Sequence, residues 1–316
     1  MNKRKIMIMM AGMVLPILAP QASAAAEHHD WEDQHVLSIN REPARAAFFP
    51  YGEHVGDRRL CLDGSWKFRW TPVPDERVFD FYRTEFDDSG WEDFLVPSNW
   101  ENRGYGTPIY VSAGYPFRID PPRVMGTPKE DYTTYKERNP VGQYRRTFTL
   151  PAHWEGDGEV LLRFDGVMSA FYVWINGEKV GYSQGSMEAS EFNVTRYLQK
   201  GQNQIALEVY RYSDGSYLED QDFWRFGGIH RSIHLIHTPD IHVRDYAVRT
   251  LPASVGDYKD FILQIDPQFS VYRGMTGKGY VLQGVLKEAS GKEVATLKGD
   301  VEDILDLEHK ASRMNE

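Results

Sequence analysis

The chain has 316 residues, is 41% hydrophobic and 13% aromatic, and carries a formal net charge of −10 at pH 7. This acidic balance argues against nucleic acid or an anionic membrane surface as a partner. The apolar content is sufficient for one to two packed domains. A single cysteine, Cys61, excludes an internal disulfide, so stability must come from packing.

The first 24 residues have the three parts of a secretory signal peptide. Residues 3–5 are basic, residues 6–19 are apolar, and residues 22–24 read Ala-Ser-Ala. The apolar run is too short for a membrane helix and is interrupted by Pro16, and no later run could span a bilayer. We therefore expect export to the periplasm or the medium, with no membrane partner and no lipid anchor.

Short strands dominate the pattern that follows. Residues 25–60 predict an extended polar arm without regular structure, and residues 101–140 a long excursion rich in Gly, Pro and Tyr. Trp66, Phe68 and Trp70 alternate with polar residues, as in a strand with one buried face. Further strands are predicted over 143–149, 160–164, 170–175, 179–182, 204–210 and 232–236, with one short helical turn over 193–198.

Two of these features indicate the architecture. Residues 170–175 are apolar at every position, as in a central strand covered on both faces. Asn176-Gly177 is a strong hairpin signal because both residues tolerate positive φ. Many short strands with almost no helical periodicity predict an all-β sandwich.

A domain boundary is predicted near residues 238–240. Beyond it, residues 242–248, 260–265 and 279–285 read as strands of a second domain, and residues 301–316 look polar and unfinished. Only 77 residues run from 240 to 316, so this second domain looks incomplete.

The connection over residues 211–231 is the most informative segment. It places acidic side chains beside aromatic ones, namely Asp214, Glu219, Asp220 and Asp222 with Tyr217, Phe223 and Trp224. Sugars suit such a segment, because their hydroxyls bind charged acceptors and their C–H faces pack on flat apolar rings. The alternative is a solvated acidic loop whose aromatic residues belong to the core.

Specific motifs in this segment resemble glycoside hydrolase family 2, and in particular its β-galactosidase branch. They are Trp224-Arg225-x-x-Gly228-Ile229-x-Arg231 and residues 213–222, supported by residues 62–68, 96–100, 105–110, 164–174 and 176–184. The resemblance implies a jelly-roll sugar-binding domain over 61–239 and part of an immunoglobulin-like sandwich over 240–316. It also implies a parent enzyme that hydrolyses terminal β-galactosides with retention.

The same resemblance implies substrate-binding residues. Asp222 matches the carboxylate that contacts galactose hydroxyls and helps to hold a sodium ion. The alternative is an acid that pairs with Arg225 or Arg231 and only supports the loop. Ser112 stands where relatives commonly carry Asn, and one hydroxyl cannot supply both the donor and the acceptor of an amide.

A magnesium site is implied at Asp30, Asp33, Gln184 and Asp214, a set of oxygen ligands that suits a hard cation. The alternative is that these are ordinary surface residues. The histidines fit no zinc spacing, and those at 230, 234 and 237 are expected to form a solvent-facing row.

No catalytic residue is predicted. A retaining glycosidase needs two carboxyl groups about 5 Å apart on either side of the bond, and in this family they lie on a TIM barrel of about 250 residues. The sequence shows no such pattern, and Glu219 and Asp222, three apart on one loop, should lie together rather than flank a bond.

We therefore expect the N-terminal, sugar-binding part of a β-galactosidase that is inactive alone. The alternative is a free-standing carbohydrate-binding module. The expected ligand is galactose or a β-galactoside, and the open choices for a protein partner are the catalytic portion or a second copy of the chain.

Overall fold

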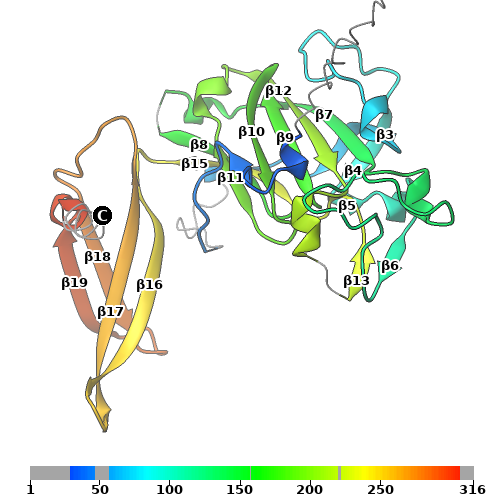
Figure 1. Ribbon diagram of the computed structural model, residues 1–316. Helices are drawn as coiled ribbons and strands as arrows, with labels where there is room; N and C mark the ends of the chain where they lie inside the picture. The colour runs from blue at the N-terminus through cyan, green and yellow to red at the C-terminus, as the bar shows by residue number, and fades with distance from the viewer. Residues whose placement is uncertain (1–28, 47–56, 157, 220–221, 307–316) are drawn as a thin grey trace, which may run out of the picture.

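The computed structural model describes residues 29–46, 57–156, 158–219 and 222–306. The predicted signal peptide and Asp220 lie outside these residues. The described part is a two-sheet β-sandwich followed by two long hairpins (Figure 1). No described helix is long and apolar enough to cross a membrane.

The larger sheet has seven antiparallel strands (Figure 1). In spatial order they are β1 (Ser38–Ile39), β10 (Glu178–Gln184), β9 (Ala170–Ile175), β12 (Gln202–Tyr210), β7 (Val141–Thr149), β3 (Gly64–Thr71) and β4 (Glu92–Val96). The predicted hairpin joins β9 to β10, and Asn176 and Gly177 have φ values of 50° and 84°. These are the positive angles that the tight turn requires.

The smaller sheet has four strands, also antiparallel. Its order is β11 (Ser190–Asn193), β8 (Glu159–Phe164), β15 (Ile233–Thr238) and β2 (Arg59–Cys61). Side chains from both sheets form one core that includes Trp66, Phe68, Phe164 and Leu235. The all-β class expected from the sequence is thus confirmed.

A second hydrophobic layer covers the outer face of the seven-stranded sheet. Along β9, Phe171, Val173 and Ile175 belong to the core between the sheets, while Tyr172 and Trp174 belong to this outer layer. This alternation explains why β9 is apolar at every position, because side chains of one strand point to opposite faces.

The N-terminal arm was expected to lack regular structure, and this was wrong for its described part. It forms a short 3₁₀ helix, η1 (Asp30–Glu32), and β1, which pairs with β10 at the edge of the sheet. Trp31 stacks on Tyr210 with ring centroids 4.0 Å apart. The arm is polar and has no periodicity of its own. It is ordered because the Trp31 indole is buried and because β1 pairs with the open edge of the sheet.

The irregular segments pair with one another in small ladders. β5 (Ser98–Asn99) pairs with β14 (Gly228–Ile229), and β6 (Ile109–Val111) pairs with β13 (Phe223–Arg225). Further 3₁₀ turns are η3 (Pro74–Glu76), η4 (Glu101–Arg103), η5 (Thr133–Tyr135), η6 (Ala152–Trp154), η7 (Thr195–Tyr197) and η8 (Asp214–Tyr217). The turn η7 lies within the predicted helical turn.

After residue 240 the described chain forms two separate two-stranded sheets. β16 (Ile241–Ser254) pairs with β17 (Asp257–Val271), and β18 (Val281–Lys287) pairs with β19 (Glu293–Asp300). The sequence did not predict β19 or the helical residues 301–306. Arg273 links this region to the sandwich by an ion pair with Glu159 of β8 (3.2 Å), and it also pairs with Asp240 at the boundary (3.3 Å).

Candidate functional site

The connection between β12 and β15 is held in place by buried polar contacts. Arg211 is fully buried, and its guanidinium pairs with Glu101 at 3.2 Å and donates to the main-chain oxygen of Thr107 at 2.8 Å. Burial raises the pKa of Glu101, and the positive charge of Arg211 opposes this shift. The pairing ties the acidic segment to the long excursion over residues 101–140.

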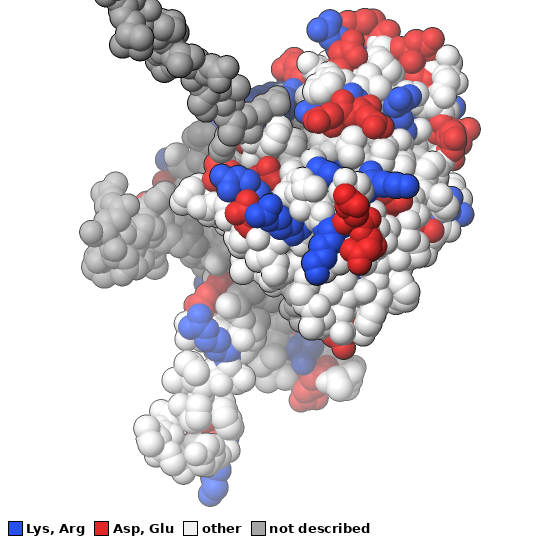
Figure 2. Space-filling model, turned by 45° about the vertical axis from the view of Figure 1, so that its right-hand side comes forward, with Lys and Arg blue, Asp and Glu red and all other residues white. Residues whose placement is uncertain are grey.

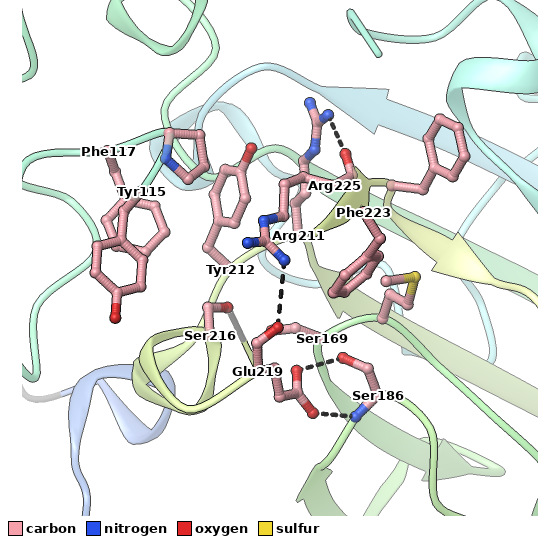
Figure 3. Close-up of a pocket in the computed structure, with 13 residues that line it drawn as sticks. Tyr115, Phe117, Ser169, Ser186, Arg211, Tyr212, Ser216, Glu219, Phe223 and Arg225 are labelled. Carbon is pink, nitrogen blue, oxygen red and sulfur yellow. Dashed lines mark hydrogen bonds between the residues drawn. The ribbon is translucent and has the colours of Figure 1, made fainter. Parts of the chain in front are cut away.

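Glu219 also has a structural role in this segment. Its carboxylate accepts hydrogen bonds from the main-chain N–H and the hydroxyl of Ser186, both at 2.6 Å. Arg225 donates from Nη1 to the main-chain oxygen of Glu219 at 3.2 Å, as Figure 3 shows. The side chain and the main-chain oxygen of Glu219 therefore both fix this part of the connection in place.

These groups surround a small cavity of about 30 Å³, lined among others by Tyr212, Ser216, Glu219, Phe223 and Arg225 (Figure 3). Ligand pockets usually measure about 300–1,000 Å³, whereas a single water needs roughly 10–15 Å³. The cavity can hold water but no sugar ring. This cavity is therefore excluded as a sugar site, and the outer surface of the segment is the part left to consider.

That outer surface carries an exposed rim made by Tyr110, Trp224 and Asp222. The two aromatic residues face each other in the β6–β13 ladder, with ring centroids 5.6 Å apart, and are 52% and 48% exposed. The hydroxyl of Tyr110 donates a hydrogen bond to the carboxylate of Asp222. This hydrogen bond raises the pKa of Tyr110.

The two predicted substrate-binding residues lie at the tip of this ladder. Val111 is paired with Phe223 at the end of the ladder, and Ser112 follows Val111 while Asp222 precedes Phe223. They are 110 positions apart in sequence. Asp222 accepts from Tyr110, and Arg231 donates to the main-chain oxygens of Asp165 and Met187.

Three of the four predicted magnesium ligands gather between η1 and η8. One oxygen of Asp214 is buried without a hydrogen-bond partner. Burial raises the pKa of Asp214, the neighbouring Gln184 opposes the shift, and Asp33 adds to it. An unpartnered carboxylate oxygen beside an amide and a second acid fits a hard cation.

The fourth predicted ligand, Asp30, is turned to other partners. Its carboxylate accepts from the hydroxyl of Tyr172 at 2.7 Å and lies 4.0 Å from the ammonium of Lys179. Among the residues that the structure describes, no three His, Cys, Asp or Glu side chains are grouped as metal ligands. Asp33, Gln184 and Asp214 would therefore have to bind the ion with water completing its shell.

The expected solvent-facing row of histidines is wrong. His234 and His237 on β15 are buried, and His230 is partly buried. His234 lies 3.3 Å from Asp165, and His237 stacks on Trp154 with centroids 5.4 Å apart. Charged and aromatic neighbours cover this sheet face, which the alternation of residues in β15 alone does not show.

Tyr110 was not predicted as a site residue, and Trp224 was noted only as one of the aromatic residues of the 211–231 segment. Both stand in the motifs noted above, but their pairing depends on a ladder between segments far apart in sequence. Their local signal is that each is a large aromatic residue two positions from a predicted polar site residue.

The exposed rim offers the flat apolar faces and the charged acceptor that sugars bind. Residues 60–239 match the family described as glycosyl hydrolases family 2, sugar binding domain. The chain belongs to this family, and the sandwich is its sugar-binding domain.

Similar proteins include β-galactosidases. The chain is 39% identical over 279 residues to one from Priestia megaterium, covering 84% of this chain and 26% of that protein. It is 41% identical over 248 residues to one from Yersinia enterocolitica, covering 75% of this chain and 22% of that protein. The chain thus spans about a quarter of the length of these relatives.

Solved structures with the same fold include β-glucuronidases. A calcium binding mutant of Bacteroides uniformis β-glucuronidase 2 matches with a TM-score of 0.58 and 23% identity, over 77% of this chain and 26% of that one. A β-glucuronidase from an uncultured Clostridium matches with a TM-score of 0.56 and 20% identity, over 81% of this chain and 40% of that one. At this identity the likeness establishes the fold alone.

Proposed function

We propose that the chain contributes one edge of a galactose-binding subsite to a retaining β-galactosidase and does not hydrolyse β-galactosides alone. The observation that carries the proposal is the exposed rim of Tyr110, Trp224 and Asp222. The similarity to β-galactosidases supports galactose as the sugar.

The rim has the chemistry for this role. The Asp222 carboxylate is an acceptor for sugar hydroxyls, and a hydrogen bond to a charged group contributes about 1.5–3 kcal/mol. The rings of Trp224 and Tyr110 offer apolar faces to the C–H side of a sugar. The hydroxyl of Tyr110 orients Asp222, so the acceptor is fixed before the sugar arrives.

Sodium and magnesium are part of the proposal. Asp222 would share a sodium ion with the sugar, as the family resemblance implies. Asp33, Gln184 and Asp214 would hold magnesium between the arm and η8, where Asp214 has an unpartnered oxygen. Magnesium there would stabilise the fold beneath the rim.

The two acids of the connection do not act as a catalytic pair in this proposal. Glu219 is bound by Ser186, whereas Asp222 is bound by Tyr110. A retaining mechanism needs two carboxyl groups about 5–5.5 Å apart with the glycosidic bond between them. We infer that the acid/base and the nucleophile are supplied by a part of the enzyme outside these residues.

Hydrolysis of o-nitrophenyl β-galactoside by the purified chain, with Mg²⁺ and Na⁺ present, tests the proposal. We expect no turnover above buffer. Turnover that is lost in both Glu219→Gln and Asp222→Asn would show that a catalytic pair exists in this loop and would overturn the proposal.

A second candidate is a free-standing carbohydrate-binding module, which the exposure of Tyr110 and Trp224 favours. Calorimetric titration with galactose separates the two. Affinity weaker than millimolar fits an edge that needs the rest of the subsite, whereas sub-millimolar affinity that is lost in Trp224→Ala would favour the module.

We further propose that the chain is exported and processed after residue 24. The support is the basic, apolar and Ala-Ser-Ala order of the first 24 residues. Mass spectrometry of the protein recovered from a bacterial periplasm should show Ala25 as the first residue. Recovery of the intact chain in the cytosol alone would contradict this.

A further inference from the structure

The excursion after β6 encloses a hollow of about 500 Å³. Its wall begins two residues after β6 ends, and it is lined among others by Ala113, Gly114, Arg118, Lys129 and Tyr132. The volume lies within the range of about 300–1,000 Å³ found for ligand sites. The hollow is thus large enough for a sugar substituent or for a whole small ligand.

Two cations line this hollow and are free to bind a ligand. Arg118 and Lys129 are both exposed, and neither side chain forms an ion pair or a hydrogen bond with a residue that the structure describes. The stem of Arg118 lies against Gly126, where an added Cβ would be 3.4 Å from Cβ of Arg118. The ammonium of Lys129 lies 5.9 Å from the centroid of the Tyr132 ring. A guanidinium and an ammonium are the groups that bind sulfate, phosphate and carboxylate oxygens.

No acidic side chain lines the hollow to neutralise these cations. Its lining residues include no Asp or Glu. Asp120 pairs with Arg123 at 3.5 Å, and Glu130 and Asp131 lie outside the lining. The hollow is therefore a positively charged place on a chain whose formal net charge is −10. This sign favours an anionic ligand over a neutral one.

The hollow begins beside the predicted sugar contact at the end of the ladder. Ser112 and Asp222 lie at this end, and Ala113 and Gly114 follow Ser112 directly. A Cβ added at Gly114 would meet nothing within 4 Å. Three small residues in a row therefore leave room for a substituent of a sugar held at the rim.

We propose that this hollow binds an anionic group, a sulfate ester or a carboxylate, carried by the saccharide that occupies the rim. Arg118 and Lys129 would donate to its oxygens. The inference rests on the proposed galactose subsite and narrows its ligand to acidic galactosides. Because the hollow belongs to a sugar-binding domain and adjoins Ser112, a group carried by a saccharide is favoured over a free ion.

Titration of the full chain followed by heteronuclear NMR tests this proposal. The probes are D-galactose 6-sulfate, D-galacturonic acid, D-galactose and sodium sulfate. An exposed charge pair contributes about two- to fivefold in affinity, so two pairs should make at least one acidic sugar bind roughly four- to 25-fold more tightly than galactose. Equal affinities for galactose and both acidic sugars would overturn the proposal. Inorganic sulfate binding as tightly as galactose 6-sulfate would also overturn it, because the site would then be one for a free ion.

Charge-removing variants locate the binding. Arg118→Gln and Lys129→Gln should each weaken binding of the acidic sugar by about two- to fivefold and leave galactose binding unchanged. Arg123→Gln removes the same charge outside the lining and is the control. All three side chains are exposed, so the fold should persist, and circular dichroism checks this.

The same titrations separate this inference from the proposed function. Trp224→Ala should weaken the binding of galactose and of the acidic sugars alike, because it removes an apolar face of the rim. No response to Trp224→Ala would count against the rim and hence against both proposals. Unchanged affinity for the acidic sugars in Arg118→Gln and Lys129→Gln, with galactose binding still sensitive to Trp224→Ala, would refute the hollow alone.

Discussion

The sandwich and the two hairpins after residue 240 both contain many large apolar residues, but the sandwich buries these residues and the hairpins expose them. Every residue of β8, β9 and β15 is buried. In β16, by contrast, the residues from Tyr246 onward are exposed. The hairpins expose large apolar side chains, among them Tyr258 at 76% and Phe261 at 52%.

Pairing on both sides explains the difference. In the sandwich, β7, β9 and β12 each have a strand on either side, and a second sheet or the arm covers their faces. Each strand of the hairpins has one neighbour. A lone two-stranded hairpin is marginally stable in water, and clustered exposed apolar residues indicate a surface that binds something else.

Alanine substitutions of two phenylalanines, one in the sandwich and one in a hairpin, test this difference in burial. Phe68→Ala in β3 removes a ring that is 1% exposed and should lower the free energy of unfolding by roughly 3–5 kcal/mol. Phe261→Ala in β17 should change it by no more than about 0.5 kcal/mol. Urea unfolding followed by tryptophan fluorescence measures both. Phe68→Leu serves if the first variant does not fold, and equal losses at the two positions would contradict the comparison.

A matched pair of glycines gives the next largest effect. A Cβ at Gly142 in β7 would lie 2.5 Å from the ring of Trp100, which is fully buried. Gly142→Ala should therefore cost about 1–3 kcal/mol through overpacking. At Gly284 in β18 the nearest atom, Cβ of Leu297, is 3.9 Å away, so Gly284→Ala should not destabilise the protein. A loss at Gly284 as large as at Gly142 would show that the hairpins are packed as tightly as the sandwich.

The pH dependence of stability tests the burial of His230 in the sandwich. Burial, assisted by Arg231, lowers the pKa of His230 from 6.5 to about 4. Between these values the unfolded chain binds a proton that the folded chain does not, so stability falls as the pH drops from about 6.5 to about 4. His230→Gln should flatten this part of the curve of unfolding free energy against pH. Exposed His35→Gln is the control, and an unchanged slope in His230→Gln would show that this ring is not the cause.

Magnesium should give the smallest effect, confined to the sandwich and its arm. If Asp33, Gln184 and Asp214 hold the ion, a stabilisation of about 1 kcal/mol would raise the melting temperature by roughly 2–4 °C. EDTA should reverse the shift, and Asp214→Asn should abolish it. A melting temperature that responds neither to Mg²⁺ nor to EDTA would mean that no site forms.

Local patterns predicted the strands of the sandwich well. The alternation of Trp66, Phe68 and Trp70 lies in β3, and Asn176-Gly177 forms the turn between β9 and β10. Both signals depend on neighbouring residues alone, since a strand repeats every two residues and a tight turn needs positive φ. Predictions of this kind do not require knowledge of what the strand packs against.

Features that depend on distant residues were missed. The pairing of β1 with β10 and the ladder of β6 with β13 each join segments that are remote in sequence. The burial of His234 and His237 likewise depends on side chains from other parts of the chain. The resemblance indicated Asp222 and Ser112 as substrate-binding residues, but only the ladder shows that both lie at the same end of β6 and β13. The contact of Tyr110 with Asp222 could not be predicted, because nothing in the chain near Tyr110 indicates its partner.

The pairing of the arm also has a consequence for the order of events during synthesis. Ser38 leaves the ribosome early, yet its partner, Ser183, is 145 positions further along the chain. At about 5–20 residues per second, that strand follows roughly 7–30 seconds later. The arm must remain unpaired throughout this interval, so a polar sequence with little tendency to aggregate is the composition that this delay requires.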